Sequence, residues 1–299
     1  MKTVPLGLTG LSVSPLCFGT LPFSPLQGGR PDAAETLERA FALGVNFIDT
    51  AQFYNNYTLL RTKREIIAAS KTYAYTREDA AEAVEEARRG LDRDVIDIFL
   101  LHEQEGEHTL RGHAPALQSL YDLKAKGVIR AVGLSTHHVA GVRAAVAAGL
   151  DVVHPLLNVA GLGIADGSRE DMAQAVGAAM EAGIGVYIMK ALGGGHLFRR
   201  AEEALTYASG RGHSLALGMR DTAEVEAAVT FYETGVLPEL KSHIPRTLHI
   251  AGWCGGCGRC AEKCTALTVR DGKAVCDDDK CVLCGYCGAA CPGFCIKII

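Results

Sequence analysis

The sequence has no excess of positive charge and no long apolar segment. Its 299 residues include 30 lysines and arginines against 34 aspartates and glutamates, which gives a formal net charge of −4. Proteins that bind nucleic acid or anionic membranes need a basic surface, which this balance does not supply. No apolar run reaches the roughly 18 residues of a membrane-spanning helix, and residues 1–5 lack the apolar core of a signal peptide. We therefore expect neither a nucleic-acid partner nor a membrane partner.

Cysteine is rare over most of the chain and dense at its end. All but one of the 11 cysteines lie in the last fifth, and eight of them form two runs with the spacing C-x2-C-x2-C-x3-C. The runs are Cys254, Cys257, Cys260 and Cys264, and Cys281, Cys284, Cys287 and Cys291. This spacing resembles that of bacterial two-cluster ferredoxins, in which the fourth cysteine of each run binds the other 4Fe–4S cluster. The resemblance assigns the ligands to two clusters, one held by Cys254, Cys257, Cys260 and Cys291 and the other by Cys281, Cys284, Cys287 and Cys264.

Zinc and disulfides are the alternatives for these cysteines. Structural zinc more often uses two separated pairs of ligands than triplets. Disulfides require an oxidising compartment. The spacing therefore favours two [4Fe–4S] clusters as cofactors, and thiolate ligands at this density indicate a reducing, cytoplasmic location.

Residues 16–233 alternate short apolar runs with longer helical patterns. The predicted strands are Leu16–Gly19, Val45–Asp49, Ile66–Ser70, Val95–Leu101, Ile129–Leu134, Val152–His154, Gly185–Met189 and Leu215–Leu217. Their apolar runs are continuous, as in parallel strands that are covered on both faces. Eight strand–helix units over about 220 residues match a TIM (β/α)8 barrel. An open doubly wound sheet is less consistent with the sequence, because the first turn lacks the G-x-G-x-x-G pattern of that fold.

The composition changes after the last predicted barrel helix. We expect the barrel over residues 1–233, a connector over 234–249 and a small α+β domain like a bacterial ferredoxin over 250–299. Within that domain, Asp271-Gly272 is the signal of a tight hairpin between residues 267–269 and 274–276.

Polar residues fall at the ends of successive predicted strands, where TIM barrels place their catalytic groups. They are Asp49, Tyr54, Lys71 and His102. The segments around them, residues 44–54, 69–71 and 97–102, resemble the hallmark segment, the lysine strand and the histidine strand of the aldo-keto reductases. Residues 6–14 resemble the amino-terminal hairpin of that family. The chain is most similar to the branch of the family that carries a carboxy-terminal iron–sulfur domain.

The resemblance implies reduction of a small-molecule carbonyl compound, or the reverse oxidation of an alcohol. Tyr54 would be the general acid. Lys71, held cationic by Asp49, would lower the pKa of Tyr54 by favouring the phenolate. His102 would orient the substrate and donate a hydrogen bond to its carbonyl oxygen.

The resemblance also implies NADPH as a cofactor. In the family, the positions of Ser135, Thr136 and His154 contact the nicotinamide carboxamide. Lys190, Leu192 and Gly193 fall in the pyrophosphate loop, and Gly218 and Arg220 fall beside the adenosine ribose. This chain departs from the family at Met189, where many members stack a tyrosine on the nicotinamide, and at Glu224 and Ala228, where many members have arginine and asparagine.

Two functions are consistent with these features. The first is an oxidoreductase whose barrel is fused to an iron–sulfur electron-transfer module. The second is an electron-transfer or redox-sensing protein, with a redox-protein partner, whose barrel is a scaffold or takes electrons from a source other than nicotinamide. Nicotinamide delivers two electrons as hydride, whereas each cluster passes one at a time, and no flavin motif is visible to connect them.

Overall fold

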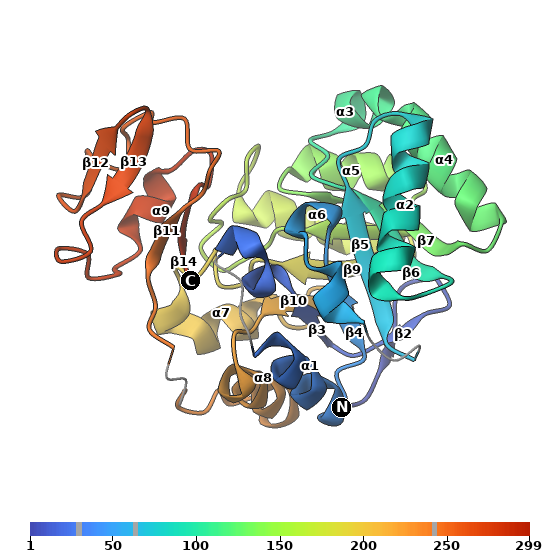
Figure 1. Ribbon diagram of the computed structural model, residues 1–299, viewed down its shortest axis with the longest axis horizontal. Coiled ribbons are helices and arrows are strands. Elements are labelled where there is room, and N and C mark those ends of the chain that lie inside the picture. Colours follow the sequence, from blue (N-terminus) through green and yellow to red (C-terminus); the bar gives the residue numbers. More distant parts are fainter. Residues whose placement is uncertain (28–31, 62–64, 241–243) are drawn as a thin grey trace.

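Eight parallel strands close into a barrel in the computed structural model, which describes residues 1–27, 32–61, 65–240 and 244–299 (Figure 1). Around the barrel the order is β10-β3-β4-β5-β6-β7-β8-β9. The strands are β3 (Leu16–Gly19), β4 (Phe47–Asp49), β5 (Ile67–Thr72), β6 (Ile96–Leu101), β7 (Ile129–Thr136), β8 (Val152–Pro155), β9 (Gly185–Met189) and β10 (Ser214–Gly218). Each coincides with one of the predicted strands, so the predicted parallel TIM barrel is confirmed.

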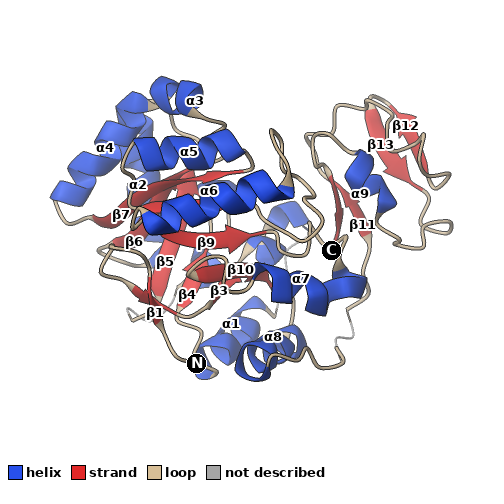
Figure 2. Ribbon diagram, turned by 180° about the vertical axis from the view of Figure 1, so that it is seen from behind, coloured by secondary structure: helices blue, strands red, loops and turns tan. Residues whose placement is uncertain are grey.

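Helices surround this barrel (Figure 2). They are α1 (Ala33–Ala42), α2 (Arg77–Leu91), α3 (Glu107–Gly112), α4 (Ala114–Ala125), α5 (Val139–Ala147), α6 (Arg169–Glu181), α7 (Ala201–Ala208) and α8 (Thr222–Thr234). The side chain of Thr76 caps α2 by accepting a hydrogen bond from the amide of Asp79 at 3.1 Å. Gly127, Gly149 and Gly183 follow α4, α5 and α6 with φ of 76°, 62° and 81°, the left-handed conformation that ends a helix at glycine. None of the helices in the described ranges is long and apolar enough to cross a bilayer.

A hairpin closes the amino end of the barrel. Strands β1 (Val4–Pro5) and β2 (Ser12–Val13) pair in antiparallel fashion, as the similarity of residues 6–14 to a family hairpin predicts. Leu6, Leu11 and Val13 are buried against the inward-facing side chains of the barrel strands, among them Phe47 and Tyr187. Because apolar side chains fill the amino end of the barrel interior, we expect a polar site inside the barrel to lie at the carboxyl ends of the strands.

The cysteine-rich segment, which we define as residues 248–299, forms two small antiparallel sheets and a short helix. Strands β11 (Leu248–Ile250) and β14 (Ile296–Ile298) pair, as do β12 (Leu267–Arg270) and β13 (Lys273–Cys276), and α9 (Tyr286–Ala290) precedes β14. The predicted hairpin turn lies between β12 and β13, and Asp271 and Gly272 there have φ of 48° and 73°. The first two residues of β11 fall within the range expected to be a connector.

The cysteine-rich segment packs on the mouth of the barrel through β14 (Figure 1). The amide of Ile298 donates to the carbonyl oxygen of Gly194 at 3.0 Å, and His196 Nε2 lies 2.8 Å from the carbonyl oxygen of Ile296. A Cβ atom at Gly195 would lie only 1.8 Å from the carbonyl oxygen of Ile298, so this close approach requires glycine. The last strand of the chain therefore covers the loop that follows β9, at the end of the barrel where polar residues gather.

Candidate active site

Strands β4 and β5 bring Asp49 and Lys71 together at the barrel mouth. Lys71 Nζ donates to Asp49 Oδ2 at 2.8 Å and to the carbonyl oxygen of Thr50 at 2.7 Å. Both side chains are almost fully buried, with exposed fractions of 1% for Lys71 and 6% for Asp49. The short 3-10 turn Gln52–Tyr54 follows β4 and places the ring of Tyr54 with its centroid 5.1 Å from Lys71 Nζ. The geometry thus assembles three of the four predicted catalytic residues.

The other oxygen of the Asp49 carboxylate lies near one residue of β8 and one residue of β9. The hydroxyl of Tyr187 donates to Asp49 Oδ1 at 2.9 Å, and His154 Nε2 lies 3.8 Å from the same oxygen. The rings of His154 and Tyr187 stack with centroids 3.9 Å apart. His154 Nδ1 is 2.6 Å from the carbonyl oxygen of Tyr187. These contacts fix the position of Asp49, so the Lys71–Asp49 pair is a rigid element of the site.

The pKa of Tyr54 shifts in the direction opposite to the one expected from Lys71. Burial raises this pKa well above its usual value, and the carboxylates of Asp49 and Glu103 raise it further. The expected lowering is therefore wrong for the site without ligands. The physical reason is that burial disfavours the phenolate and that Asp49 already neutralises Lys71 at 2.8 Å. Tyr54 therefore faces a neutral pair and the carboxylate of Glu103 rather than an isolated cation.

His102 follows β6 and lies beside Tyr54. The two ring centroids are 6.2 Å apart with an interplanar angle of 74°, and the ring of Tyr73 stacks on His102 at 4.3 Å. Burial holds the pKa of His102 well below its usual value, and the charges of Lys71 and Lys190 lower it further. The imidazole is therefore neutral. Its buried Nδ1 lacks a hydrogen-bond partner among the residues described, which leaves this nitrogen available to a ligand.

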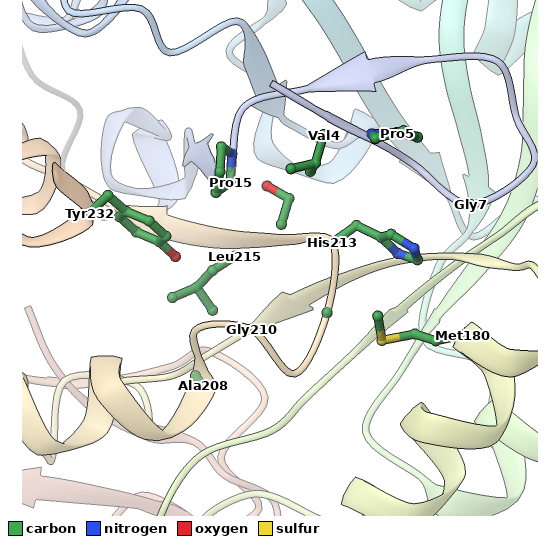
Figure 3. Close-up of a pocket in the computed structure, with 12 residues that line it drawn as sticks. Val4, Pro5, Gly7, Pro15, Met180, Ala208, Gly210, His213, Leu215 and Tyr232 are labelled. Carbon is green, nitrogen blue, oxygen red and sulfur yellow. The ribbon is translucent and has the colours of Figure 1, made fainter. Parts of the chain in front are cut away.

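A cavity of about 690 Å³ opens at this end of the barrel. It runs from Asp49 and Tyr54, past Met189, to Arg220 and Ala228, and Ile298 and Ile299 of the cysteine-rich segment line it as well. Five of the residues expected to contact NADPH line this cavity, namely His154, Lys190, Leu192, Gly218 and Arg220. A second cavity of about 460 Å³ lies at the opposite, amino end beside Val4, His213 and Tyr232, away from the predicted catalytic residues (Figure 3).

The remaining residues expected at the cofactor, Ser135, Thr136 and Gly193, are not among the described residues that line the large cavity. Ser135 Oγ accepts a hydrogen bond from the amide of Glu103 at 2.9 Å. Thr136 Oγ1 accepts from the amide of His138 at 2.9 Å. Both hydroxyl groups are fully buried and hold the loops after β6 and β7 in place.

Arg220 is already engaged within the protein. Its Nη2 and Nε donate to Glu224 Oε1 at 2.7 and 3.0 Å, and its amide donates to Glu224 Oε2 at 2.8 Å. Arg246 Nη2 lies 3.2 Å from the same Glu224 oxygen and also lines the cavity. Arg246 therefore brings a further cation to the adenosine end of the cavity, and it reaches this end from the stretch before β11.

Some of the cysteines of both runs meet at one small core. Cys260 and Cys287 are buried there with Leu267, Ala274 and Ile296, while Cys254, Cys264 and Cys291 pack against it. Burial raises the pKa of Cys260, with contributions from Cys291 and Cys254. Burial likewise raises the pKa of Cys287 to about 11, with contributions from Cys264, Cys284 and Cys281. The thiols that act on Cys260 and on Cys287 are thus cysteines that the crossed-over pairing places in the same cluster as each of them.

No three His, Cys, Asp or Glu side chains in the described ranges converge as the ligands of a single metal ion would. Ligand sulfurs around one tetrahedral zinc, each about 2.3 Å from the ion, lie about 4 Å apart. In a 4Fe–4S cubane each thiolate binds a different iron, so the ligand sulfurs lie further apart than they do around one zinc ion. The donor chemistry of eight cysteines therefore suits two clusters without such a convergence.

Sequence reasoning missed several residues that belong to the site. Tyr187, Glu103 and Tyr73 contact or flank the predicted catalytic residues, and Phe294 and Lys297 reach the mouth from the cysteine-rich segment. Tyr187 lies two residues before Met189, so alternation along β9 could have placed its side chain inside the barrel. Lys297 carries no local signal, because its position depends on how the cysteine-rich segment packs.

Comparisons with known proteins agree with this architecture. The sequence profile of the aldo/keto reductase family matches residues 15–234, which is more than half of the chain. Among solved structures, a putative aldo-keto reductase from Pseudomonas aeruginosa is 26% identical with a TM-score of 0.65, over 76% of this chain and 93% of that one. Aldo-keto reductase AKR11C1 from Bacillus halodurans is 21% identical with a TM-score of 0.64, over 78% and 91%, a likeness that bears on the fold alone.

Curated relatives match over a shorter stretch. The L-galactose dehydrogenase of Arabidopsis thaliana is 28% identical over an alignment 149 residues long, which covers 44% of this chain and 47% of that protein. The NADH-specific methylglyoxal reductase of Escherichia coli is 27% identical over an alignment 167 residues long, which covers 44% of this chain and 51% of that protein. The chain thus spans about half the length of the curated relatives that it matches. With the barrel, the polar residues at its mouth and the profile match all in agreement, the chain belongs to the aldo/keto reductase family.

Proposed function

We propose that this protein is an oxidoreductase that reduces a carbonyl compound at the barrel mouth, or oxidises the corresponding alcohol. The observation that carries the proposal is the buried Lys71–Asp49 pair, 2.8 Å apart, beneath the ring of Tyr54. A barrel that served as a scaffold would gain little from burying two charges at its mouth, because removing them from water is costly. Strongly perturbed ionisable groups beside a cavity are typical of catalytic sites.

The chain's own residues supply the proton chemistry. Tyr54 is protonated at neutral pH, because its pKa lies above its usual value, and it would donate this proton to the carbonyl oxygen as charge develops there. Lys71 would stabilise the resulting phenolate once the proton has left. His102 is neutral, so it would contribute a hydrogen bond rather than a proton, and it would orient the carbonyl group.

The large cavity suits an extended dinucleotide, and we propose NADPH as its occupant. The cavity continues from the predicted catalytic residues to the two arginines that share Glu224. Leu192, Gly218 and Arg220, which line the cavity, would hold the pyrophosphate and the adenosine end, and His154 would lie near the nicotinamide. When bound, the nicotinamide supplies or accepts the hydride. For Arg220 to contact a 2′-phosphate, its guanidinium would have to share its donors between that phosphate and Glu224.

We further propose that the cysteine-rich segment is a ferredoxin-like module with two [4Fe–4S] clusters, ligated in the crossed-over pairing. The neighbours of Cys260 and Cys287 support this pairing. When bound, the clusters transfer single electrons. A redox-protein partner and a cytoplasmic location remain predictions that follow from this module.

Deuterium transfer tests the proposed reaction. A library of aldehydes and ketones would be incubated anaerobically with the holoprotein and NADPH deuterated at the hydride position. We expect one deuterium on the former carbonyl carbon of the product. Failure of every carbonyl compound to react, with NADPH or with a reduced one-electron donor, would refute the proposed function.

One observation favours a second function, in which the barrel takes its electrons from the clusters. Strand β14 covers the loop after β9, because the amide of Ile298 donates a hydrogen bond to the carbonyl oxygen of Gly194 at 3.0 Å. The family resemblance places the pyrophosphate at this loop, so the strand occupies part of the surface that a nucleotide would contact. Anaerobic titration of the holoprotein with NADPH, followed by cluster absorbance and nucleotide fluorescence, separates the two. Saturable nucleotide binding favours the NADPH-dependent enzyme. An absence of binding, together with turnover supported by a reduced one-electron donor, favours the cluster-fed enzyme.

A further inference from the structure

Two lysines from different parts of the chain meet at the barrel mouth. Lys190 follows β9, and Lys297 lies in β14 of the cysteine-rich segment. Both line the large cavity, and both ammonium groups lie near the ring of Phe294, with Nζ 5.5 Å from its centroid for Lys190 and 2.9 Å for Lys297. In the described part of the chain neither lysine forms an ion pair with a carboxylate. Burial lowers the pKa of Lys297 to about 6, the charge of Lys190 adds to this shift, and the charges of Cys291, Cys295 and Glu103 oppose it. Two ammonium groups so placed repel each other, so both keep their protons at neutral pH only when an anion lies with them.

The backbone and the neighbours of Lys190 direct its ammonium group toward the predicted catalytic residues. Lys190 has a φ of 59°, a left-handed conformation that is uncommon for a residue with a Cβ and is found often at functional sites. Its Nζ contacts Nε2 of His137, which follows β7, and its charge acts on His102 after β6. The proposed dinucleotide path runs the other way, along β9 and β10 to Arg220. These contacts place the ammonium group of Lys190 on the side of the predicted catalytic residues, whereas the family resemblance assigns Lys190 to the pyrophosphate loop.

The carboxylate of Glu103 acts on both lysines but forms no ion pair with either. Glu103 accepts a hydrogen bond from the hydroxyl of Tyr73 at 2.9 Å, and its other oxygen lies 3.8 Å from His137. Burial lowers the pKa of Lys190 to about 8, the charge of Glu103 opposes this shift, and the charge of Lys71 adds to it. An oxyanion in the cavity would relieve the desolvation and the repulsion together, because it would pair with both ammonium groups.

We propose that Lys190 and Lys297 bind an oxyanionic group, a carboxylate or a phosphate, on the carbonyl substrate. The cysteine-rich segment then completes the substrate site by supplying Lys297, and the enzyme selects aldehydes or ketones that carry a negative charge. His137 positions Lys190 by accepting its hydrogen bond, since burial holds the pKa of His137 well below its usual value and keeps the ring neutral. This inference rests on the proposed carbonyl reduction.

Matched substrate pairs test the selectivity. One pair is succinic semialdehyde and butanal, which differ in a carboxylate, and the other is glycolaldehyde phosphate and glycolaldehyde, which differ in a phosphate. The wild-type holoprotein should prefer the anionic member of at least one pair, and the pair that shows the preference identifies the anion. Lys190→Met and Lys297→Met should each reduce that preference, measured as the ratio of kcat/KM values, by about 10- to 100-fold, as expected for the loss of a charge-assisted hydrogen bond. Lys297→Arg should keep most of it, because the positive charge remains.

Turnover of the uncharged members separates this inference from the proposed function. Uncharged substrates should react with Lys297→Met at a rate within about 3-fold of wild type, since they lack the group that Lys297 binds. The exposed Lys126, at the end of α4, gives the matched control Lys126→Met, which should not change the preference. Equal reactivity of both members of each pair in the wild type, or a preference that survives both methionine substitutions, would overturn the inference and leave carbonyl reduction intact.

If no carbonyl compound is reduced, a binding measurement tests whether Lys190 and Lys297 form an anion site. Inorganic phosphate and succinate would be titrated calorimetrically into the holoprotein and its variants. Binding that is lost in Lys190→Met and Lys297→Met but kept in Lys126→Met supports the anion site. Equal binding in all variants, or none in the wild type, contradicts it.

Discussion

Replacing Lys71 by methionine perturbs the stability of the barrel and its chemistry in ways that can be separated. Lys71 Nζ is 2.8 Å from Asp49 Oδ2, and the side chains are 1% and 6% exposed. Lys71→Met would leave Asp49 as a buried charge without its cation, which costs about 3–5 kcal/mol. Asp49 keeps the hydrogen bond from Tyr187 at 2.9 Å, so we expect the lower end of that range, about 3 kcal/mol. Turnover should also fall by roughly 10²–10⁴, because Lys71 no longer stabilises the Tyr54 phenolate.

A matched double variant distinguishes the two effects. Asp49→Asn with Lys71→Met removes both charges, so most of the lost stability should return, whereas turnover should not. Stability would be measured as the free energy of unfolding in urea, followed by circular dichroism, and iron content would be measured on the same samples. Iron content should not change in any of these variants, since neither residue lies in the cysteine-rich segment. If Lys71→Met unfolds at the same urea concentration as the wild type, the Lys71–Asp49 pair does not have the buried geometry described above, and the reasoning fails.

Three further outcomes follow from the site. Cys264→Ser should damage the cluster held by the second cysteine run, because the fourth ligand crosses over; loss of the paramagnetic signal of the other cluster would show that the pairing is wrong. Arg220→Ala and Arg246→Ala should each weaken NADPH binding more than NADH binding, since each removes a cation from the adenosine end of the cavity, and equal effects on both nucleotides in a fluorescence titration would count against NADPH. Burial lowers the pKa of His154 to about 4. In the unfolded chain His154 takes up a proton near pH 6.5, whereas in the folded protein it does so only near pH 4. Between these two pH values protonation favours the unfolded chain, so the free energy of unfolding falls as the pH falls, by up to about 1.4 kcal/mol per pH unit. Urea unfolding between pH 7 and pH 5 should show a shallower loss for His154→Gln, and identical slopes would contradict this.

The strands of the barrel could be predicted because their signal is local. Continuous apolar runs such as those at Ile96–Leu101 and Gly185–Met189 occur where both faces of a strand are covered, and glycines such as Gly127 and Gly183 end the helices between them. A residue at the carboxyl end of a predicted strand can then be placed at the mouth of the barrel, next to the residues that end the neighbouring strands. This is why Asp49 and Lys71 could be expected to meet.

The charges at the mouth could not be predicted in the same way, because they depend on contacts between distant parts of the chain. The pKa of Tyr54 is raised first by burial and then by the carboxylates of Asp49 and Glu103, because Asp49 compensates the charge of Lys71. Arg220 pairs with Glu224, one helical turn away, and also with neighbours that include the backbone of Pro245 at 3.5 Å. Lys297 reaches the cavity because β14 packs on the loop after β9. In each case the sequence supplies the residue type and the tertiary packing decides its partner.

The most direct test of carbonyl reduction at the barrel mouth is the turnover of Tyr54→Phe on an authentic substrate. The substitution removes one hydroxyl from a side chain that lines the cavity, so stability should change by less than about 1 kcal/mol and iron content should not change. Turnover should fall by roughly 10²–10⁴ with NADPH, and equally with a reduced one-electron donor if that donor supports the reaction, because the protonation step is common to both. Combining Tyr54→Phe with Lys71→Met should reduce it little further, since both residues act on one proton transfer. Wild-type turnover by Tyr54→Phe would contradict the account and place the chemistry outside these residues.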